Sequence, residues 1–507
     1  MSTFSTLYPF AGGNIRQRHH ANRLMDMRQT LDDLVRQMSS GKKSETYGGL
    51  GESRVSSLTF RNQQEIANGF TDVIDVTTIR LQVMTRSTNE MRTLAEKARS
   101  VMLGTRGTGG YPEITSAVKQ VQAQFEQIVS SLNDQHEGLY LYSGRARDVR
   151  PVVDANTMIW GDGTNAGLRQ VVDERRQADI GTGNGRMLST NVGTLTTLSE
   201  DAVGNPFGIK LVPGTAGGGM TNVTVVGPGG GPTNISFNFT GQPNPGERVT
   251  FTITLPDGKT KNIGFAVGVA GAADDTVFNV GATPADTALN LKNAIDGKLS
   301  SLASGELREA SAKIASEQFF SGSNTVFPPR VQPPFATSTS YAVPGTRPTV
   351  IWYKGDDNLA VAARDTQRAA VDSGTFISFG ARANEAPLRD TLVALGMFLS
   401  EDYPPNVAST KDRFDAATGR AIEIMNTTGG PNAILQMNSD FGRSTAQVIE
   451  TKQRHNDRKE FLSGLLAEIE NVDNEEVAVR LTSLRTQLEA SYQATARVSQ
   501  LSIVNYL

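Results

Sequence analysis

The sequence predicts an α+β fold in which long helices from both ends of the chain form a discontinuous bundle or coiled coil around a β-rich middle region. Residues 201–270 hold 15 glycines and 7 charged residues, whereas residues 451–490 hold 1 glycine and 14 charged residues. Near both ends, apolar residues recur at spacings of three and four, which is typical of coiled-coil helices. In the middle they alternate with polar residues between Gly and Pro, which is typical of strands.

The first helix is predicted over about residues 22–38. Its large apolar residues are spaced alternately three and four apart, so they share one face, and Ser39-Ser40-Gly41 is expected to end it. These residues are Leu24, Met27, Leu31, Leu34 and Met38.

A second, much longer helix is predicted between the glycines at 48–51 and Gly104. A third apolar stripe follows over residues 114–132. The buried stripe of the long helix is expected to hold Ile66, Phe70, Val73, Thr77, Leu81, Met84, Thr88, Met91, Leu94, Ala98 and Val101.

A β-hairpin is predicted in the middle of the chain. Apolar residues alternate with polar ones over 249–255 and again over 263–267, on either side of the turn signal Pro256-Asp257-Gly258. Residues 288–302 then return to helical spacing.

The two tryptophans of the chain lie in similar segments, Thr157-Met158-Ile159-Trp160-Gly161-Asp162 and 349–356. The similarity predicts two related β units, each a strand leading into a turn, that flank an insertion of about 200–345. Chance resemblance of two such turns is the alternative.

The C-terminal part mirrors the N-terminal part. Pro431 marks a restart after Gly429-Gly430, and the stripe of the following helix is expected to hold Ile434, Met437, Phe441, Val448, Phe461, Leu465 and Ile469. Asp473 is a predicted N-cap. The last helix then carries Val477, Leu481, Leu484, Leu488, Ser491, Thr495 and Val498 in heptad spacing and runs nearly to Leu507.

The changes in composition and in apolar spacing along the chain predict four regions, three of them discontinuous. They are terminal assembly helices, a helical bundle, a β-rich region and a Gly/Thr-rich insertion. Their predicted bounds are 1–40 with 472–507, 41–145 with 386–471, 146–200 with 345–385, and 201–344.

Composition narrows the classes of function. With 49 basic and 52 acidic residues the net charge is −3, so we expect neither a nucleic acid nor a membrane as partner. The absence of cysteine removes disulfides and thiolate chemistry. No secretory signal or membrane-spanning stretch is recognisable.

No constellation of residues predicts catalysis, a metal site or a cofactor. The four histidines include no H-E-x-x-H pair. Gly41-Lys42-Lys43-Ser44 lacks the upstream glycine of a phosphate-binding loop, because position 36 is Arg36. The paired aspartates lie among turn residues. We therefore expect a protein that is not an enzyme.

The apolar stripes predict self-association. A large apolar side chain left in water costs roughly 1.5–3 kcal/mol, and two short terminal helices alone are marginally stable. We expect neighbouring subunits to complete them. The predicted assembly interface consists of Leu24, Met27, Leu31, Leu34, Met38, Leu481, Leu484, Leu488, Tyr492, Val498 and Leu501.

The stretches 34–42 and 488–507, with the long helix that follows the first, resemble the two ends of bacterial flagellins and their hook-associated relatives. Residues 138–144, followed by Trp160-Gly161-Asp162, look more like the members at the hook–filament junction than like filament flagellin. Filament flagellin and a secreted surface-binding protein are the alternatives.

The resemblance implies a secreted structural subunit of the bacterial flagellum. Such a subunit is exported unfolded by the flagellar type III apparatus. Its expected partners are flagellin, other hook-associated proteins, further copies of itself and an export chaperone at the C-terminal helix.

Overall fold

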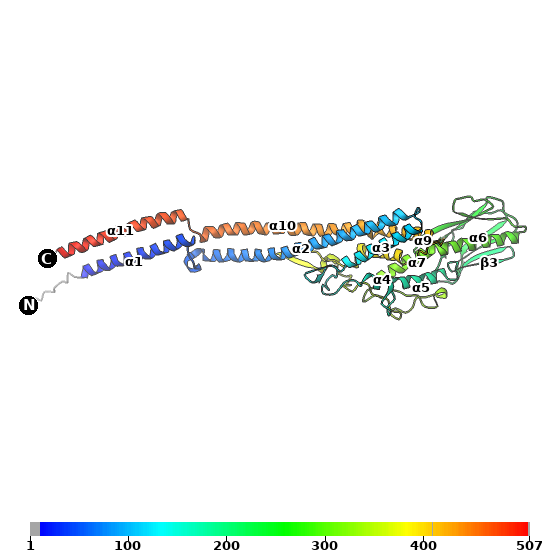
Figure 1. Ribbon diagram of the computed structural model, residues 1–507, viewed down its shortest axis with the longest axis horizontal. Coiled ribbons are helices and arrows are strands. Elements are labelled where there is room, and N and C mark those ends of the chain that lie inside the picture. Colours follow the sequence, from blue (N-terminus) through cyan, green and yellow to red (C-terminus); the bar gives the residue numbers. More distant parts are fainter. Residues whose placement is uncertain (1–10, 408, 505–507) are drawn as a thin grey trace, which may run out of the picture. The chain divides into compact units, whose positions relative to one another are not determined.

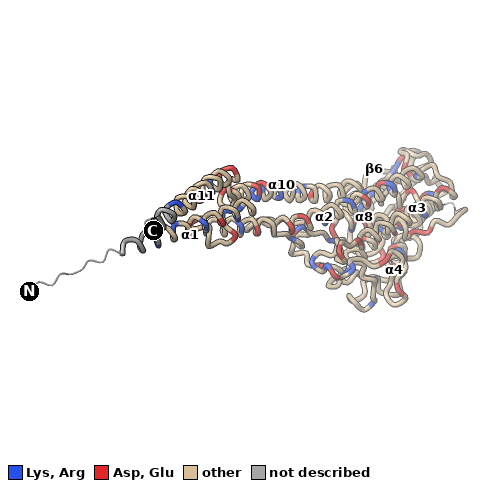
Figure 2. Tube along the Cα trace, turned by 60° about the vertical axis from the view of Figure 1, so that its left-hand side comes forward, with Lys and Arg blue, Asp and Glu red and all other residues tan. Residues whose placement is uncertain are grey.

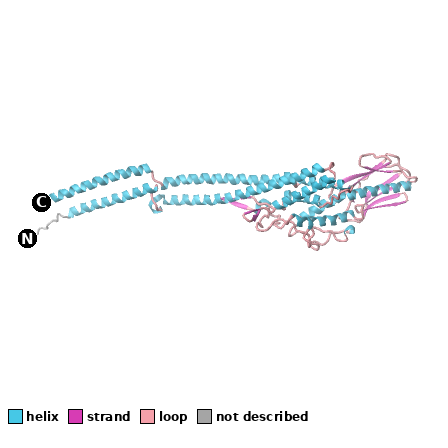
Figure 3. Cartoon of the chain, in the orientation of Figure 1, coloured by secondary structure: helices cyan, strands magenta, loops and turns pink. Residues whose placement is uncertain are grey.

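A computed structural model describes residues 11–407 and 409–504. It confirms the α+β class: the longest helices come from the two ends of the chain, and the main sheets come from its middle (Figure 3). The chain divides into two compact units. One holds the described residues of Met1–Val76, Ala370–Thr375 and Val448–Leu507, and the other holds Thr77–Ala369 and Phe376–Gln447.

The first unit is built from helices of both chain ends. Blue α1 (Ala11–Ser40) and red α11 (Asn474–Val504) lie side by side in Figure 1. The ends of both helices follow the predicted signals, since Gly41 has φ +67° and Asp473 Oδ1 accepts a hydrogen bond from Glu475 N at 2.9 Å. Helix α1 starts earlier than the predicted residue 22. A 3₁₀ helix, Tyr47–Ser53, leads into α2.

Helices α2 (Arg54–Thr105) and α10 (Gly430–Glu470) contribute to both units, and both confirm the long helices expected from the sequence. The predicted stripe is wrong at three positions, because Ile66, Val73 and Phe461 are 51%, 41% and 66% exposed. Consecutive helical residues point 100° apart, and here the following residue faces inward instead. The buried residues are Ala67, Ile74 and Leu462.

Helices dominate one part of the second unit. Helix α8 (Ala386–Leu399) is buried on nearly all sides and packs against α3, α7 and α9. Helix α3 confirms the third predicted stripe. The remaining helices here are α3 (Tyr111–Ser131), α4 (Ala155–Trp160), α5 (Leu168–Ile180), α7 (Glu306–Phe320) and α9 (Ser409–Thr427), with 3₁₀ turns at Phe335–Thr337 and Ala363–Thr366.

Two sheets form the rest of the second unit. One is antiparallel with the order β3 (Met187–Val192), β4 (Leu195–Glu200), β8 (Asn234–Phe239), β7 (Val223–Gly229). The other has the order β11 (Asp275–Phe278), β10 (Thr260–Val267), β9 (Arg248–Thr254), β5 (Lys210–Leu211), with β6 (Gly217–Gly219) also on β9. A small hairpin of this unit pairs β1 (Gln135–His136) with β2 (Leu139–Tyr140). Another hairpin pairs β12 (Arg368–Asp372) with β13 (Thr375–Ser378), and its residues Ala370–Thr375 belong to the first unit.

The predicted hairpin is confirmed as β9 and β10, which pair antiparallel. The alternation along β9 buries Val249, Phe251 and Ile253. The Phe251 ring lies 6.4 Å from Phe237 of the other sheet, and helix α6 (Pro284–Ser304), also predicted, packs its apolar stripe into the same core.

The prediction of two related β units is wrong at the first tryptophan. Asp154 Oδ1 accepts a hydrogen bond from Thr157 N at 2.9 Å and thereby caps α4, so Trp160 ends a short helix rather than a strand. The segment of Trp352 is extended and buried. The two similar segments therefore adopt different conformations.

Acidic and basic residues are interspersed along the chain, as the near-neutral net charge indicates (Figure 2). Over the described residues, no helix combines the length and the apolar character that crossing a bilayer requires.

Candidate assembly interface

The terminal pair of α1 and α11 covers its predicted apolar seam only in part. Leu34 and Leu488 are buried, with 8% and 6% of their surface exposed. Five further seam residues are only half-buried, although each lies on the shared face of its helix. They are Leu24, Met27 and Leu31 of α1, and Leu481 and Leu484 of α11.

Of the remaining four predicted interface residues, two lie outside this seam, and the side chains of the other two are not described. Met38 and Tyr492 are 49% and 48% exposed. The side chains of Val498 and Leu501 are not among those described. Two helices leave both flanks of their seam open to water, and such open seams are typical of helices completed by further helices.

A tight joint connects the two ends of the chain where both terminal helices break. Lys42 forms a β-bridge with Asn471. Lys43 N donates to Glu470 O at 2.7 Å, and Val472 N donates to Gly41 O at 3.0 Å. The positive φ of Gly41 allows the chain to turn here after α1. These backbone bonds fix the register of α1 against α11.

Glu470 anchors this joint to α2. Its carboxylate accepts hydrogen bonds from Arg61 Nε at 2.9 Å and from Ser57 Oγ at 2.6 Å. The hydrogen bond and charge of Arg61, with the hydroxyl of Ser57, lower the pKa of Glu470 to about 2. No sequence signal points to this contact, because its partners are more than 400 positions apart in sequence.

A second apolar surface runs along α2 within the first unit and was also missed. Val55, Leu58, Ile66 and Val76 are 45–66% exposed. At 100° per residue they lie within about 80° of one another on one face of the helix. Their heptad-like spacing is a usable sequence signal, but the sequence alone did not show which of two adjacent stripes faces inward. We call these four residues the outer stripe of α2.

Three of the histidines differ in their surroundings. His19 and His20 are exposed on α1, whereas the His455 ring stacks on Phe70 at 5.4 Å and its Nε2 lies 2.8 Å from Val371 O. Among the described residues, no group of three or more His, Asp or Glu could hold a metal ion.

Residues 425–507 match the family described as the bacterial flagellin C-terminal helical region. This match covers all of α10 and all of α11, and α11 carries six of the eleven predicted interface residues. No curated protein matches the chain.

Two solved structures, both from Legionella pneumophila, were also found. The flagellar hook associated protein-3 shares 10% identity with a TM-score of 0.26, covering 82% of this chain and 97% of its own. The flagellar junction protein FlgL shares 11% identity with a TM-score of 0.24, covering 79% of this chain and 98% of its own.

Proposed function

We propose that this chain, whose residues 425–507 match the flagellin C-terminal helical region, is a secreted structural subunit of the bacterial flagellum at the hook–filament junction. The observation that carries the proposal is the half-covered seam of α1 and α11, which lies partly within the matched region. The placement at the junction rests on the resemblance of residues 138–144 and 160–162 to junction members of the family.

Neighbouring axial subunits would complete the terminal pair. Each half-buried leucine or methionine still exposes apolar surface whose removal from water is worth roughly 1 kcal/mol. Five such residues, together with Met38 and Tyr492, supply several kcal/mol per subunit to assembly. The same helices contribute little as an isolated pair, so their order is coupled to incorporation.

The outer stripe of α2 would serve lateral contacts. It presents Val55, Leu58, Ile66 and Val76 on one helical face, which suits packing against a helix of a flagellin, a hook-associated protein or a second copy of this chain.

Before assembly, the C-terminal helix needs a temporary partner. Leu481, Leu484 and Tyr492 leave apolar surface uncovered in the single chain, and such surface favours aggregation. We therefore propose that an export chaperone binds α11 until the subunit reaches the flagellum. Capture of a chaperone by the full chain, but not by a variant with Leu481 and Leu484 changed to Asp, would support this role.

The assembly role is tested by charge substitution in the seam. Leu31→Asp with Leu484→Asp places carboxylates in the seam, and we expect loss of the subunit from isolated flagella of cells in which it is the sole copy. Gln29→Asp with Thr482→Asp is the matched control, because both residues are exposed on the same two helices. Incorporation of the seam variant at the control level would overturn the proposal.

The position of this chain along the flagellum distinguishes a junction protein from a filament flagellin. Immunogold labelling of isolated flagella is expected to place this chain only at the base of the filament, where it meets the hook. Labelling along the whole filament would instead identify a filament flagellin.

A further inference from the structure

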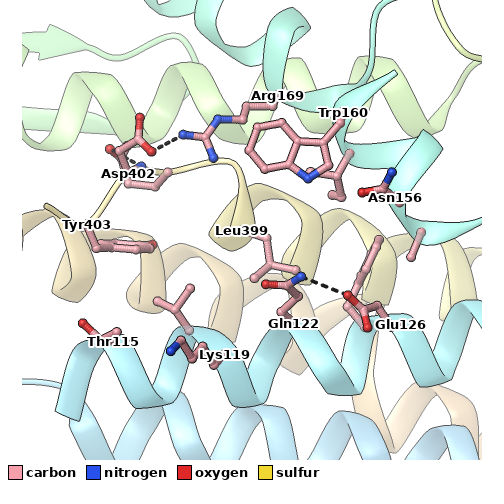
Figure 4. Close-up of a pocket in the computed structure, with 15 residues that line it drawn as sticks. Thr115, Lys119, Gln122, Glu126, Asn156, Trp160, Arg169, Leu399, Asp402 and Tyr403 are labelled. Atoms are coloured by element: carbon pink, nitrogen blue, oxygen red, sulfur yellow. Dashed lines mark hydrogen bonds and ion pairs between the residues drawn. The ribbon is translucent and has the colours of Figure 1, made fainter. Parts of the chain in front are cut away.

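The second unit holds a cavity of about 270 Å³ between α3 and the end of α4. Its floor is apolar and comes from Val118, Phe125, Ile159 and Leu399. Figure 4 shows Lys119, Gln122 and Glu126 of α3 on one side, and Trp160 with Arg169 of α5 on the other. Ligand cavities combine an apolar floor with a few polar groups in this way, and this volume lies near the lower end of their range of about 300–1,000 Å³.

Trp160 is the unusual feature of this cavity. It is 59% exposed, whereas the other tryptophan, Trp352, is fully buried and donates its indole N–H to Phe320 O at 2.9 Å. An indole ring in water is costly, and packing inside the chain does not explain the position of Trp160.

The indole is nevertheless held in place. The guanidinium of Arg169 lies 4.6 Å from its ring centroid, in a cation–π contact, and Arg169 is ion-paired with Asp402. Gly161, with φ +86°, ends α4 directly after the tryptophan, and a Cβ there would meet Asn165 O at 2.4 Å. The ring is therefore pre-organised at the cavity wall.

The lining of the cavity has no excess of positive charge. Lys119 and Arg169 are balanced by Glu126 and Asp402, and the remaining acidic residue, Glu401, is ion-paired with Arg176. Glu126 accepts a hydrogen bond from Gln122 Nε2 at 2.9 Å. An anionic ligand such as a phosphate would find no excess of positive charge here. Amides and carboxylates of this kind bind groups that both donate and accept hydrogen bonds.

We propose that this cavity binds one ring of a neutral carbohydrate, with the apolar C–H face of the sugar against Trp160 and its hydroxyls at the polar rim. A pyranose combines an apolar face with a ring of hydroxyls, each of which is both donor and acceptor. Gln122, Asn156 and Asp402 supply complementary groups around the aromatic platform. The site is independent of the assembly interface, since all its residues belong to the second unit.

The test uses the full-length chain with methyl glucoside, methyl galactoside, methyl mannoside and N-acetylglucosamine as probes. Binding is measured by ligand-observed saturation-transfer NMR and by tryptophan fluorescence, in which Trp160 is the accessible fluorophore. We expect at least one probe to saturate, with a dissociation constant on the order of millimolar. Trp160→Ala and Asn156→Ala should weaken binding roughly tenfold or more.

Phe327→Ala is the matched control, because Phe327 is a 54% exposed aromatic residue of the same unit outside the cavity. It should bind the probe like the unchanged chain, and circular dichroism should show all variants folded. Failure of every probe to saturate, or equal binding by Trp160→Ala, would overturn the proposal. So would burial of Trp160 in the assembled flagellum combined with a loss of incorporation by Trp160→Ala, since that result would assign the tryptophan to a protein contact.

Discussion

The replacement of Glu309 by Gln should remove a pH dependence of stability from the second unit. Glu309 of α7 is completely buried, and a hydrogen bond with the carboxylate of Glu401 favours its protonated form. Arg176 Nη2 lies 3.9 Å from Glu309 Oε1 but only 2.5 Å from Glu401 Oε2. Arg176 is therefore paired closely with Glu401 and only at longer range with Glu309.

Burial, reinforced by the negative charge of Glu401, raises the pKa of Glu309 from 4.5 to about 8. A carboxyl group whose pKa is raised in the folded state binds its proton more tightly there than in the unfolded chain. Its contribution to stability is complete below about pH 4.5 and is lost as the pH rises through 8. The loss amounts to about 1.4 kcal/mol per pH unit at most, or about 4 kcal/mol between pH 5 and 8.

The contribution of Glu401 to stability changes in a different pH range. Against the effect of burial, the charges of Arg176 and Arg308 lower the pKa of Glu401. Its contribution is therefore lost only as the pH falls below its ordinary value of 4.5. Above pH 5, the difference in the free energy of unfolding between the unchanged chain and Glu309→Gln reports the titration of Glu309 alone, because the other titrating groups are common to both.

Urea unfolding at pH 5, 6, 7 and 8, followed by the fluorescence of Trp352, measures this difference. Trp352 is a local reporter, because its ring lies 5.3 Å from Phe320 at the end of the same helix, and Trp160→Phe in both proteins removes the second fluorophore. Ser311→Ala, a buried and non-titrating change on α7, is the control and should lower stability equally at every pH. A constant difference between Glu309→Gln and the unchanged chain from pH 5 to 8 would refute the reasoning.

Three further changes have defined outcomes. Glu470→Gln removes the charged acceptor of Arg61 and should cost about 1–3 kcal/mol, measured as faster hydrogen exchange at the joint. In the unchanged chain, whose Glu470 has a lowered pKa, the same loosening should occur as the pH falls from about 4.5 to 2, and equal protection factors, corrected for the intrinsic exchange rate at each pH, at pH 6 and pH 2 would contradict this. Asp473→Ala removes the cap of α11 and should cost about 1 kcal/mol, seen as lower helicity by circular dichroism, with Asp473→Asn largely restoring it. Glu174→Ala leaves the buried Arg330 unpaired and should destabilise the second unit by about 3–5 kcal/mol in urea unfolding; a loss below 1 kcal/mol would show that Arg330 reaches water.

The elements of the first unit follow closely from local sequence signals. Spacings of three and four residues predicted α1 and α11, while Gly41 and Asp473 marked their ends. The face that each long helix turns inward did not follow as reliably. On α2, Ile66 and Ala67 both belong to plausible stripes, and only the folded structure shows that Ala67 is the buried one.

The charged interior of the second unit had no sequence signal. Glu174 pairs with Arg330 and Arg347, more than 150 positions away, and Glu309 meets Arg176 and Glu401 from distant elements. A charge in a sequence is by default expected at the surface, so these contacts become visible only when the chain has brought the elements together.

The sequence by itself determined the long helices at both ends of the chain, the hairpin and helix in its middle, and the apolar seam that the terminal helices present. These properties depend on side-chain periodicity and capping, which act within a few residues. The tertiary structure alone decided which side chains remain exposed, as at Trp160 and the outer stripe of α2, and which carboxyl groups lose their solvent. Exposure and ionisation depend on neighbours that folding supplies from elsewhere in the chain.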